Sequence, residues 1–372
     1  MPTSSLYQYR PLPQGLFHDL LVRLESIAVG TYGGFLRLPK DRQQVMLAVL
    51  AKAARHLLMF KSPRTTRSGI DRDLIAIKPL VASMRRAKSR ELIAEHYGSV
   101  PEGFLGALSK TSGPQTVIYY DLLFNTFVDP RNQTVALVVK QLPELDLNRL
   151  LTLLELDPVF LRPRFALKVK NEAEAKALNV TLGLIRQVVG GAANDEALRQ
   201  SIRDMGERTP LATWASNWLR RVPQISYPAL SLGDHWLPLD SGAKLTEAGL
   251  RLQLCVGTPS RIIGVLKGER FYFEYSKRGV IAEIQAIGPQ RHLVLAGVHL
   301  AGNGIVPRVL RTEVERQFLA AGVPGLDSWP EDCPWRMVER VCRHEFPHTD
   351  DGFGLDRLEH DDFAGLEQQV AA

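Results

Sequence analysis

The chain has 372 residues, of which 45% are hydrophobic and 23% are charged, a balance typical of folded globular proteins. A chain of this length exceeds what one hydrophobic core usually supports, so we expect more than one structural unit. No apolar run reaches the roughly 18 residues of a membrane span, and the N-terminal segment lacks the apolar stretch of a signal peptide. The three cysteines are too few for a disulfide framework. We therefore expect a cytoplasmic protein with reduced thiols and no membrane partner.

Charge is distributed unevenly along the chain, although the net value is only +6. Residues 1–110 hold 17 Lys and Arg against 8 Asp and Glu, whereas residues 341–372 hold 2 against 8. A basic region attracts the phosphates of nucleic acids by releasing their counterions, but the same charges also occur on ordinary solvated helix surfaces. The first region is therefore a candidate for contact with DNA or RNA.

Helical periodicity dominates residues 1–222. Apolar residues recur every three or four positions over residues 41–60, which predicts a helix with Asp41 as its N-cap. A second helix is predicted over residues 71–97, with Pro79 as the point of a potential interruption. Further helices are predicted over residues 100–108, 117–127, 143–157, 171–189, 194–205 and 209–222.

The densest basic cluster lies on the second of these predicted helices. It consists of Arg85, Arg86, Lys88 and Arg90. At these spacings the side chains point in several directions around one helix, which is typical of a solvated surface. Nucleic-acid binding through these four residues is the alternative, because they supply the counter-charge for phosphates.

Two tryptophans, Trp214 and Trp218, are four residues apart on the last predicted helix of this region. Side chains at that spacing share one face of a helix. Base-stacking platforms are usually displayed on sheets or loops, so we expect both indoles to pack in the core.

Strand-like alternation replaces helical periodicity in the last third of the chain. Strands are predicted at residues 271–275, 280–287 and 292–300, with a turn at Lys277-Arg278-Gly279. One short helix should precede them at residues 260–266, with Thr258 as its cap and Pro259 in its first turn. Another helix is predicted at residues 307–321.

These patterns predict an α+β fold. We expect a basic, mainly helical region at residues 1–222 and a module of one helix plus an antiparallel meander at residues 225–322. A short helix and an acidic tail should follow at residues 323–372.

The motifs of the meander module resemble a known family. Leu254-Cys255-Val256-Gly257 precedes a short helix, and a strand with Ala282-Glu283-Ile284 and the turn Ala301-Gly302-Asn303 follow. This order resembles the PcfJ-like family, named for a conjugative-plasmid protein, over about residues 230–320. Where the family often has His, Tyr and Gln, this chain has Leu254, Pro259 and His299. The resemblance implies a protein of plasmids or other mobile elements, without a settled reaction.

Cys255 is a candidate nucleophile of this module. It precedes a predicted helix N-terminus, whose dipole favours a thiolate. His299 would act as base, with Asn303, Gln285 or Glu283 orienting its imidazole, as in cysteine hydrolases and transferases. His292 and His299 are an odd number of residues apart, so in an unbroken strand they would face opposite sides. His299 is favoured because it is nearer the Asn303 turn.

Two other interpretations of these residues remain open. Cys255 is flanked by Leu254 and Val256, so it can also be a small buried hydrophobic residue. The module can also bind a protein partner or a small ligand, with Glu283 and Gln285 as binding residues. In that case the protein is not an enzyme.

The sequence contains no motif that indicates a metal or cofactor. Cys333, Cys342, His344 and His348 have the chemistry of zinc ligands, but the two cysteines are too widely spaced for a zinc knuckle. The phosphate loop, the dinucleotide-binding glycine motif, His-Glu-x-x-His and Gly-x-Ser-x-Gly are all absent. Nucleotide-driven motors, dinucleotide oxidoreductases, zincins and esterases are therefore disfavoured.

Overall fold

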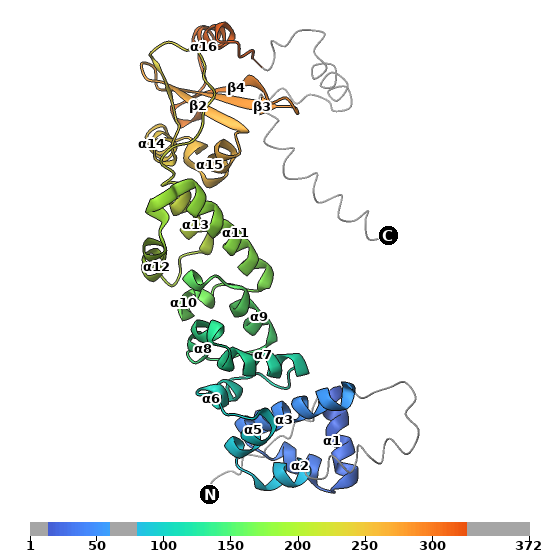
Figure 1. The fold of residues 1–372 in the computed structure, drawn as a ribbon. Helices are drawn as coiled ribbons and strands as arrows, with labels where there is room; N and C mark the ends of the chain where they lie inside the picture. Colours follow the sequence, from blue (N-terminus) through green and yellow to red (C-terminus); the bar gives the residue numbers. More distant parts are fainter. Residues whose placement is uncertain (1–13, 60–79, 326–372) are drawn as a thin grey trace, which may run out of the picture. The chain divides into compact units, whose positions relative to one another are not determined.

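The computed structural model describes residues 14–59 and 80–325, which belong to two compact units (Figure 1). Unit 1 ends at Leu219 and unit 2 begins at Arg220. Unit 1 is helical, and unit 2 combines helices with one antiparallel sheet, so the chain has the predicted α+β fold. None of the helices in these two ranges has both the length and the apolar composition needed to cross a bilayer.

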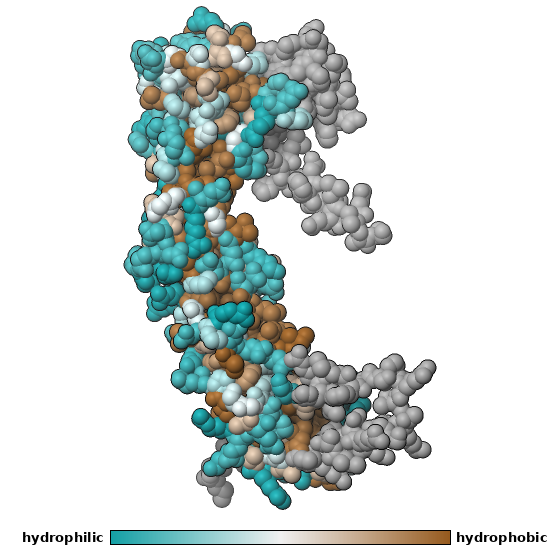
Figure 2. Space-filling view, viewed as in Figure 1, coloured by the Kyte–Doolittle hydropathy of each residue, from teal (hydrophilic) through white to brown (hydrophobic). Residues whose placement is uncertain are grey.

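Unit 1 is built from α-helices joined by short loops and 3₁₀ turns. Hydrophilic side chains cover much of its visible face, with apolar patches between them (Figure 2). Residues 80–86 are helical. The other elements are α1 (Leu16–Ile27), α2 (Thr31–Leu36), α3 (Lys40–Met59), α5 (Ser89–Tyr97), α6 (Phe104–Ser109), α7 (Val117–Val128), η1 (Pro130–Asn132), α8 (Gln133–Val139), α9 (Leu147–Glu155), η2 (Pro158–Phe160), α10 (Pro163–Ala166), α11 (Glu172–Val189), η3 (Gly190–Ala193), α12 (Asp195–Arg203) and α13 (Leu211–Leu219).

Helix α11 has the limits that its sequence predicts. The Asn171 side chain accepts a hydrogen bond from the Glu174 N–H at 2.9 Å, which caps the first turn. The helix ends at Gly190, whose φ of 68° is accessible to glycine at little cost. In α3, by contrast, the helix begins at Lys40, so Asp41 lies in the first turn and is not the predicted N-cap.

The helix predicted over residues 71–97 has a break at residues 87–88, a position that the sequence did not indicate. Within its described part, helical residues 80–86 are separated from α5 by a break, and Lys88 has extended backbone angles there. Arg42 of α3 donates hydrogen bonds to the carbonyls of Met84 and Ala87, at 3.1 and 2.6 Å, which satisfies acceptors left at the end of the first helix. The Lys88 N–H donates to the Glu91 carboxylate at 2.8 Å and starts α5.

The two tryptophans of α13 pack in the core of unit 1, as predicted. Trp214 and Trp218 are 3% and 2% exposed. Both indole N–H groups donate to the Ser201 hydroxyl, at 2.9 and 3.1 Å, and the Trp214 ring packs edge-on against Phe160. Neither ring is displayed for base stacking.

The described part of unit 2, residues 220–325, has one strand and one helix more than predicted. Its elements are β1 (Trp236–Pro238), α14 (Gly242–Leu252), η4 (Cys255–Gly257), α15 (Pro259–Leu266), β2 (Arg270–Tyr275), β3 (Val280–Ile287), β4 (His292–Leu300), η5 (Ala301–Asn303) and α16 (Arg308–Ala320). The strands form one antiparallel sheet in the order β1-β2-β3-β4. The expectation of a single helix before the meander is therefore wrong. Strand β1 has only three residues, too few for an alternation signal.

The sheet of unit 2 has one apolar face, which packs against α16 (Figure 1). This face carries alternate residues of each strand, because successive side chains point to opposite sides. Val314 and Phe318 of α16 are fully buried against it. The core residues contributed by the strands are Trp236, Phe271, Phe273, Tyr275, Val280, Ala282, Ile284, Leu295 and Val298.

The opposite face of the same sheet carries charged and polar side chains. On β2 and β3 it includes Tyr272, Glu274 and Glu283, each of which is less than a tenth exposed. Helices α14 and α15 contribute the arginines that meet these carboxylates: Arg251 pairs with Glu274, and Arg261 pairs with Glu283. The polar face therefore lies between the sheet and these two helices.

Candidate functional site

Glu283 lies at the centre of the polar face. In β3 it is the register partner of Tyr272 on β2 and of Gly297 on β4, and it is 6% exposed. A carboxylate removed from water to this extent needs charged or hydrogen-bonding partners.

Four side chains contact the Glu283 carboxylate. Arg270 Nη1, Gln285 Nε2 and Arg261 Nη1 lie 3.1, 3.3 and 3.4 Å from its Oε1 atom. His299 Nε2 lies 3.2 Å from Oε2. We call these five residues together with Tyr272 the Glu283 cluster.

The partners keep the Glu283 carboxyl ionised in spite of its burial. Burial acts to raise its pKa, but the hydrogen bond from His299 and the charge of Arg261 outweigh this effect. The net result is a pKa below the usual glutamate value. The carboxylate is therefore negatively charged at neutral pH.

His299 can reach Glu283 because its neighbour on the same side of β4 has no side chain. A Cβ atom added to Gly297 would lie 2.9 Å from His299 Nε2. The imidazole therefore occupies space that any other residue at position 297 would fill. Two residues predicted for binding, Glu283 and Gln285, and one predicted for catalysis, His299, are brought together in this way.

A β-bulge changes the faces of the two histidines. The register of β4 shifts between Leu295 and Gly297, which leaves Ala296 without a partner on β3. His292 then pairs with Ile287 and His299 with Ile281, two positions on the same side of β3. The expectation that the histidines face opposite sides is therefore wrong. His292 lies at the other end of the strand, where its ring nitrogen is 2.8 Å from the Gln290 side chain.

Tyr272 contributes a buried hydroxyl to the cluster. The residue is 1% exposed, and its hydroxyl is buried beside Arg261, with which it interacts. Burial raises the pKa of this phenol, and the charge of Glu283 acts in the same direction, whereas Arg261 acts to lower the pKa by its charge and by a hydrogen bond. The hydroxyl therefore stays protonated, close to Arg261 and Cys255.

Cys255 is exposed, which overturns the interpretation that it is a buried hydrophobic residue. Its neighbours Leu254 and Val256 are buried at 8% and 3% exposure, so η4 turns only the cysteine outward. The imidazole of His299 is bonded to Glu283, and no hydrogen bond to the Cys255 thiol occurs among the described contacts. The structure thus provides an accessible thiol without the predicted thiol–imidazole pair.

Asn303 does not join the cluster. It lies in η5, is exposed and has a left-handed φ of 54°. Among the hydrogen bonds of the described residues, none connects its side chain with His299 or Cys255. Glu283 is the residue that contacts His299.

The four predicted basic residues of unit 1 lie on both sides of the helix break. Arg85 donates to the carbonyls of Ala28 and Val29, at 3.3 and 3.0 Å, and so supports the end of α1. Arg86, Lys88 and Arg90 are exposed. Arg85 is itself exposed but has a structural role, and the side chains of the other three are also accessible from solvent.

Sequence reasoning missed Arg261, Arg270 and Tyr272. Two of them can be placed from the predicted turn at residues 277–279, because the turn fixes the register of the two strands that it joins. Pairing Tyr275 with Val280 across this turn places Tyr272 opposite Glu283 and Arg270 opposite Gln285. Arg261 comes from a separate helix, and no local pattern connects it with the hairpin.

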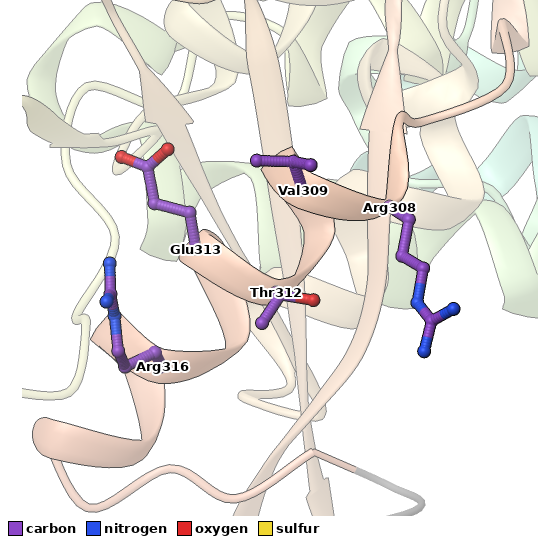
Figure 3. A pocket seen from close by; sticks show the side chains of 5 residues that line it. All are labelled: Arg308, Val309, Thr312, Glu313 and Arg316. Atoms are coloured by element: carbon purple, nitrogen blue, oxygen red, sulfur yellow. The ribbon is translucent and has the colours of Figure 1, made fainter.

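The outer side of α16 has an open hollow of about 420 Å³. It is lined by Arg308, Val309, Thr312, Glu313 and Arg316, and Figure 3 shows Arg308 on one side and Glu313 with Arg316 on the other. None of the predicted site residues lines this hollow.

Metal chemistry has no support in the described part of the chain. No group of three His, Cys, Asp or Glu side chains suited to a metal ion occurs there. Cys333, Cys342, His344 and His348 lie outside the described residues, as does the acidic tail.

No protein-family model, curated protein or solved structure matches this chain. Its chemistry is therefore inferred from its own residues. The Glu283 cluster combines two guanidinium groups, an imidazole, an amide and a hydroxyl, all of which can recognise a polar ligand. These groups make the polar face of unit 2 the candidate functional site.

Proposed function

We propose that unit 2 is a ligand-binding module of a mobile-element protein of the PcfJ-like kind, and that the Glu283 cluster is its binding site. The observation that carries the proposal is the set of polar partners around one buried carboxylate. Arg261, Arg270 and His299 have side chains that are 16%, 20% and 29% exposed, so solvent reaches each of them. A ligand can contact these groups while Glu283 holds them in position.

The energetics also favour a role in recognition. Replacing a buried ion pair by apolar residues of similar volume is often neutral or stabilising. The other face of the same sheet is filled by apolar side chains that pack against α16. A charged cluster is therefore not needed to stabilise the sheet, and ligand recognition gives it a function.

This proposal predicts that a protein-free small-molecule extract of bacterial cells raises the melting temperature of the purified chain. Arg270→Gln should abolish the rise, because it removes one guanidinium that faces the ligand. Arg251→Gln is the matched control, since Arg251 forms an ion pair on the same face with Glu274, outside the cluster. An equal rise in the wild type and in Arg270→Gln would refute this site.

An enzyme that uses Cys255 as nucleophile is the second candidate, favoured by the exposure of the thiol beside Arg261 and Tyr272. The test uses a variant in which Cys333 and Cys342 are replaced by serine, so that Cys255 is the only thiol. The rate of Cys255 alkylation is measured across pH in this variant and in the same variant with His299→Gln. If the pH dependence of alkylation matches that of a free cysteine peptide in both variants, only the binding role remains.

We also propose that unit 1 contacts DNA or RNA through Arg86, Lys88 and Arg90. The proposal is supported by the exposure of these three side chains around the helix break. Replacing all three by alanine should weaken binding to a duplex and reduce the slope of log affinity against log salt by about 2 to 3. Arg131→Ala is the control, because Arg131 is exposed and paired with Asp129. Binding that does not depend on salt would exclude this contact.

A further inference from the structure

We infer that the outer face of α16 is a docking surface for the acidic C-terminal segment of the same chain, residues 341–372. This face lies opposite the buried side of the helix and consists of the exposed residues Arg308, Val309, Thr312, Arg316 and Leu319. Three observations support the inference: the arginines of the face, its exposed apolar side chains, and the composition and reach of the C-terminal segment.

Arg308, Thr312 and Arg316 form a row along this face. They are four residues apart, so their side chains follow one another on one side of the helix, with about 12 Å of helix between the two arginines. All three line the hollow of about 420 Å³, with Arg308 and Arg316 on opposite sides of it (Figure 3). Within the described part of the chain, neither guanidinium group has a hydrogen bond or an ion pair. Both are therefore available to acidic side chains.

The stability of α16 does not explain its arginines. Arg308 is the first residue of the helix, and the first turn contains no acidic residue. A cation at this end opposes the helix dipole, so stability alone favours Asp or Glu there. The helix has three arginines against two glutamates, and Glu313 accepts hydrogen bonds from Tyr275 and Gln317 at 3.4 and 3.3 Å. The row of arginines therefore keeps an excess of positive charge.

The apolar side chains of this surface distinguish between possible partners. Val309 and Leu319 are 83% and 57% exposed, and Ile305, three residues before the helix, is 95% exposed. A nucleic-acid backbone would neutralise the arginines but leave these side chains in water, because its contacts are ionic and polar. A protein segment with both acidic and apolar side chains can cover both kinds of group.

The C-terminal segment has this mixed composition. Residues 341–372 contain 8 Asp and Glu against 2 Lys and Arg. Between the acidic residues lie large apolar residues, which include Phe346, Phe353, Leu355, Leu358, Phe363 and Leu366. The segment therefore complements the outer face of α16 in charge and in apolar character.

The segment is also long enough to reach α16 within one molecule. The described chain ends beside β4, where the Pro324 carbonyl accepts a hydrogen bond from the Leu295 N–H at 2.9 Å. Residues 326–340 connect this point with the acidic segment and span at most about 50 Å when extended. Helix α16 has 13 residues and is only about 20 Å long. A tethered segment reaches an effective concentration of roughly millimolar, so weak contacts are sufficient for docking.

Zero-length carbodiimide cross-linking of the full chain tests the inference. The reagent joins a lysine amine to a carboxylate in contact with it, so Arg316→Lys introduces a reporter on the outer face and keeps the positive charge. We expect cross-links from position 316 to carboxylates of residues 341–372 in mass spectra. Salt at about 0.5 M should lower their yield severalfold, because it screens ion pairs. Lys277 is the control, since it is exposed in the same unit on the turn between β2 and β3.

A second substitution in the Arg316→Lys protein shows whether the row acts as a unit. Arg308→Ala should lower the yield of these cross-links about threefold without a change in melting temperature, because Arg308 is exposed and has no partner in the described part of the chain. A yield from position 316 no higher than that from Lys277 would overturn the inference. Cross-links found only between isotope-labelled and unlabelled molecules would also overturn it and assign the surface to a second copy. If no cross-link forms while Arg308→Ala weakens binding to a DNA duplex, the surface binds nucleic acid instead.

Discussion

Replacing Glu283 by glutamine should lower the free energy of unfolding of unit 2 by about 3 kcal/mol. The substitution preserves shape but removes the negative charge that faces Arg261 and Arg270, whose side chains are only 16% and 20% exposed. Two poorly hydrated guanidinium groups would then lose the negative charge that they share. Hydrogen exchange of the β3 amides measures the change, and we expect exchange through global unfolding to accelerate roughly a hundredfold.

Glu274→Gln is the matched control for this substitution. Glu274 lies on the same face and is similarly buried, but its partner Arg251 is 47% exposed. Water can hydrate the released Arg251 guanidinium, so we expect a loss of no more than about 1 kcal/mol. If both variants lost the same free energy of unfolding, the contacts of Glu283 would contribute no more to stability than the ordinary ion pair of Glu274.

The effect of Glu283→Gln should also depend on pH in a defined direction. The pKa of Glu283 is lowered in the folded protein, where burial is outweighed by His299 and Arg261. A carboxyl of this kind stabilises the fold above its unfolded pKa of about 4.3, and the contribution disappears as pH falls through the lower folded value. The wild type and the variant should therefore differ fully at neutral pH and converge in acid. A difference that persists unchanged in acid would contradict the ionised carboxylate.

Local sequence patterns were sufficient for the elements with strong periodicity. The three longer strands of unit 2 and the limits of α11 follow from alternation, turn residues and a capping asparagine. The break at Lys88 was missed because Arg42, 42 and 45 residues away from its acceptors at Met84 and Ala87, stabilises it. A tertiary contact of this kind has no signature in the helix itself.

The candidate site was predictable only in part, for a similar reason. Glu283, Gln285 and His299 were identified because they lie on adjacent strands of one motif-rich segment. Ala296 bulges from β4 and reverses the alternation after it, so a count along an ideal strand gave the wrong face for one histidine. Arg261 could not be predicted, because it reaches the site through the packing of α15 on the sheet, which no local sequence pattern indicates.

The glycine of Leu254-Cys255-Val256-Gly257 is explained by close backbone packing. A Cβ atom at Gly257 would lie 2.8 Å from Thr246 Cα and 2.9 Å from the Leu245 carbonyl oxygen, both in the backbone of α14. Gly249 of α14 faces the same contact, since a Cβ there would lie 2.9 Å from the Gly257 nitrogen. The two glycines together allow η4 to lie directly against α14.

Gly257→Ala should therefore destabilise unit 2 by about 2 to 3 kcal/mol. A clash with backbone cannot be relieved by a change of rotamer, so η4 must move away from α14 and carry Cys255 with it. Urea unfolding followed by hydrogen exchange of unit 2 measures the loss. Gly233→Ala is the control in the same unit, because a Cβ there meets nothing within 4 Å, and we expect a change within about 0.5 kcal/mol. If Gly257→Ala were as stable as this control, packing against α14 would not require a glycine at this position. The glycine would then have to be explained by its position two residues after the exposed Cys255.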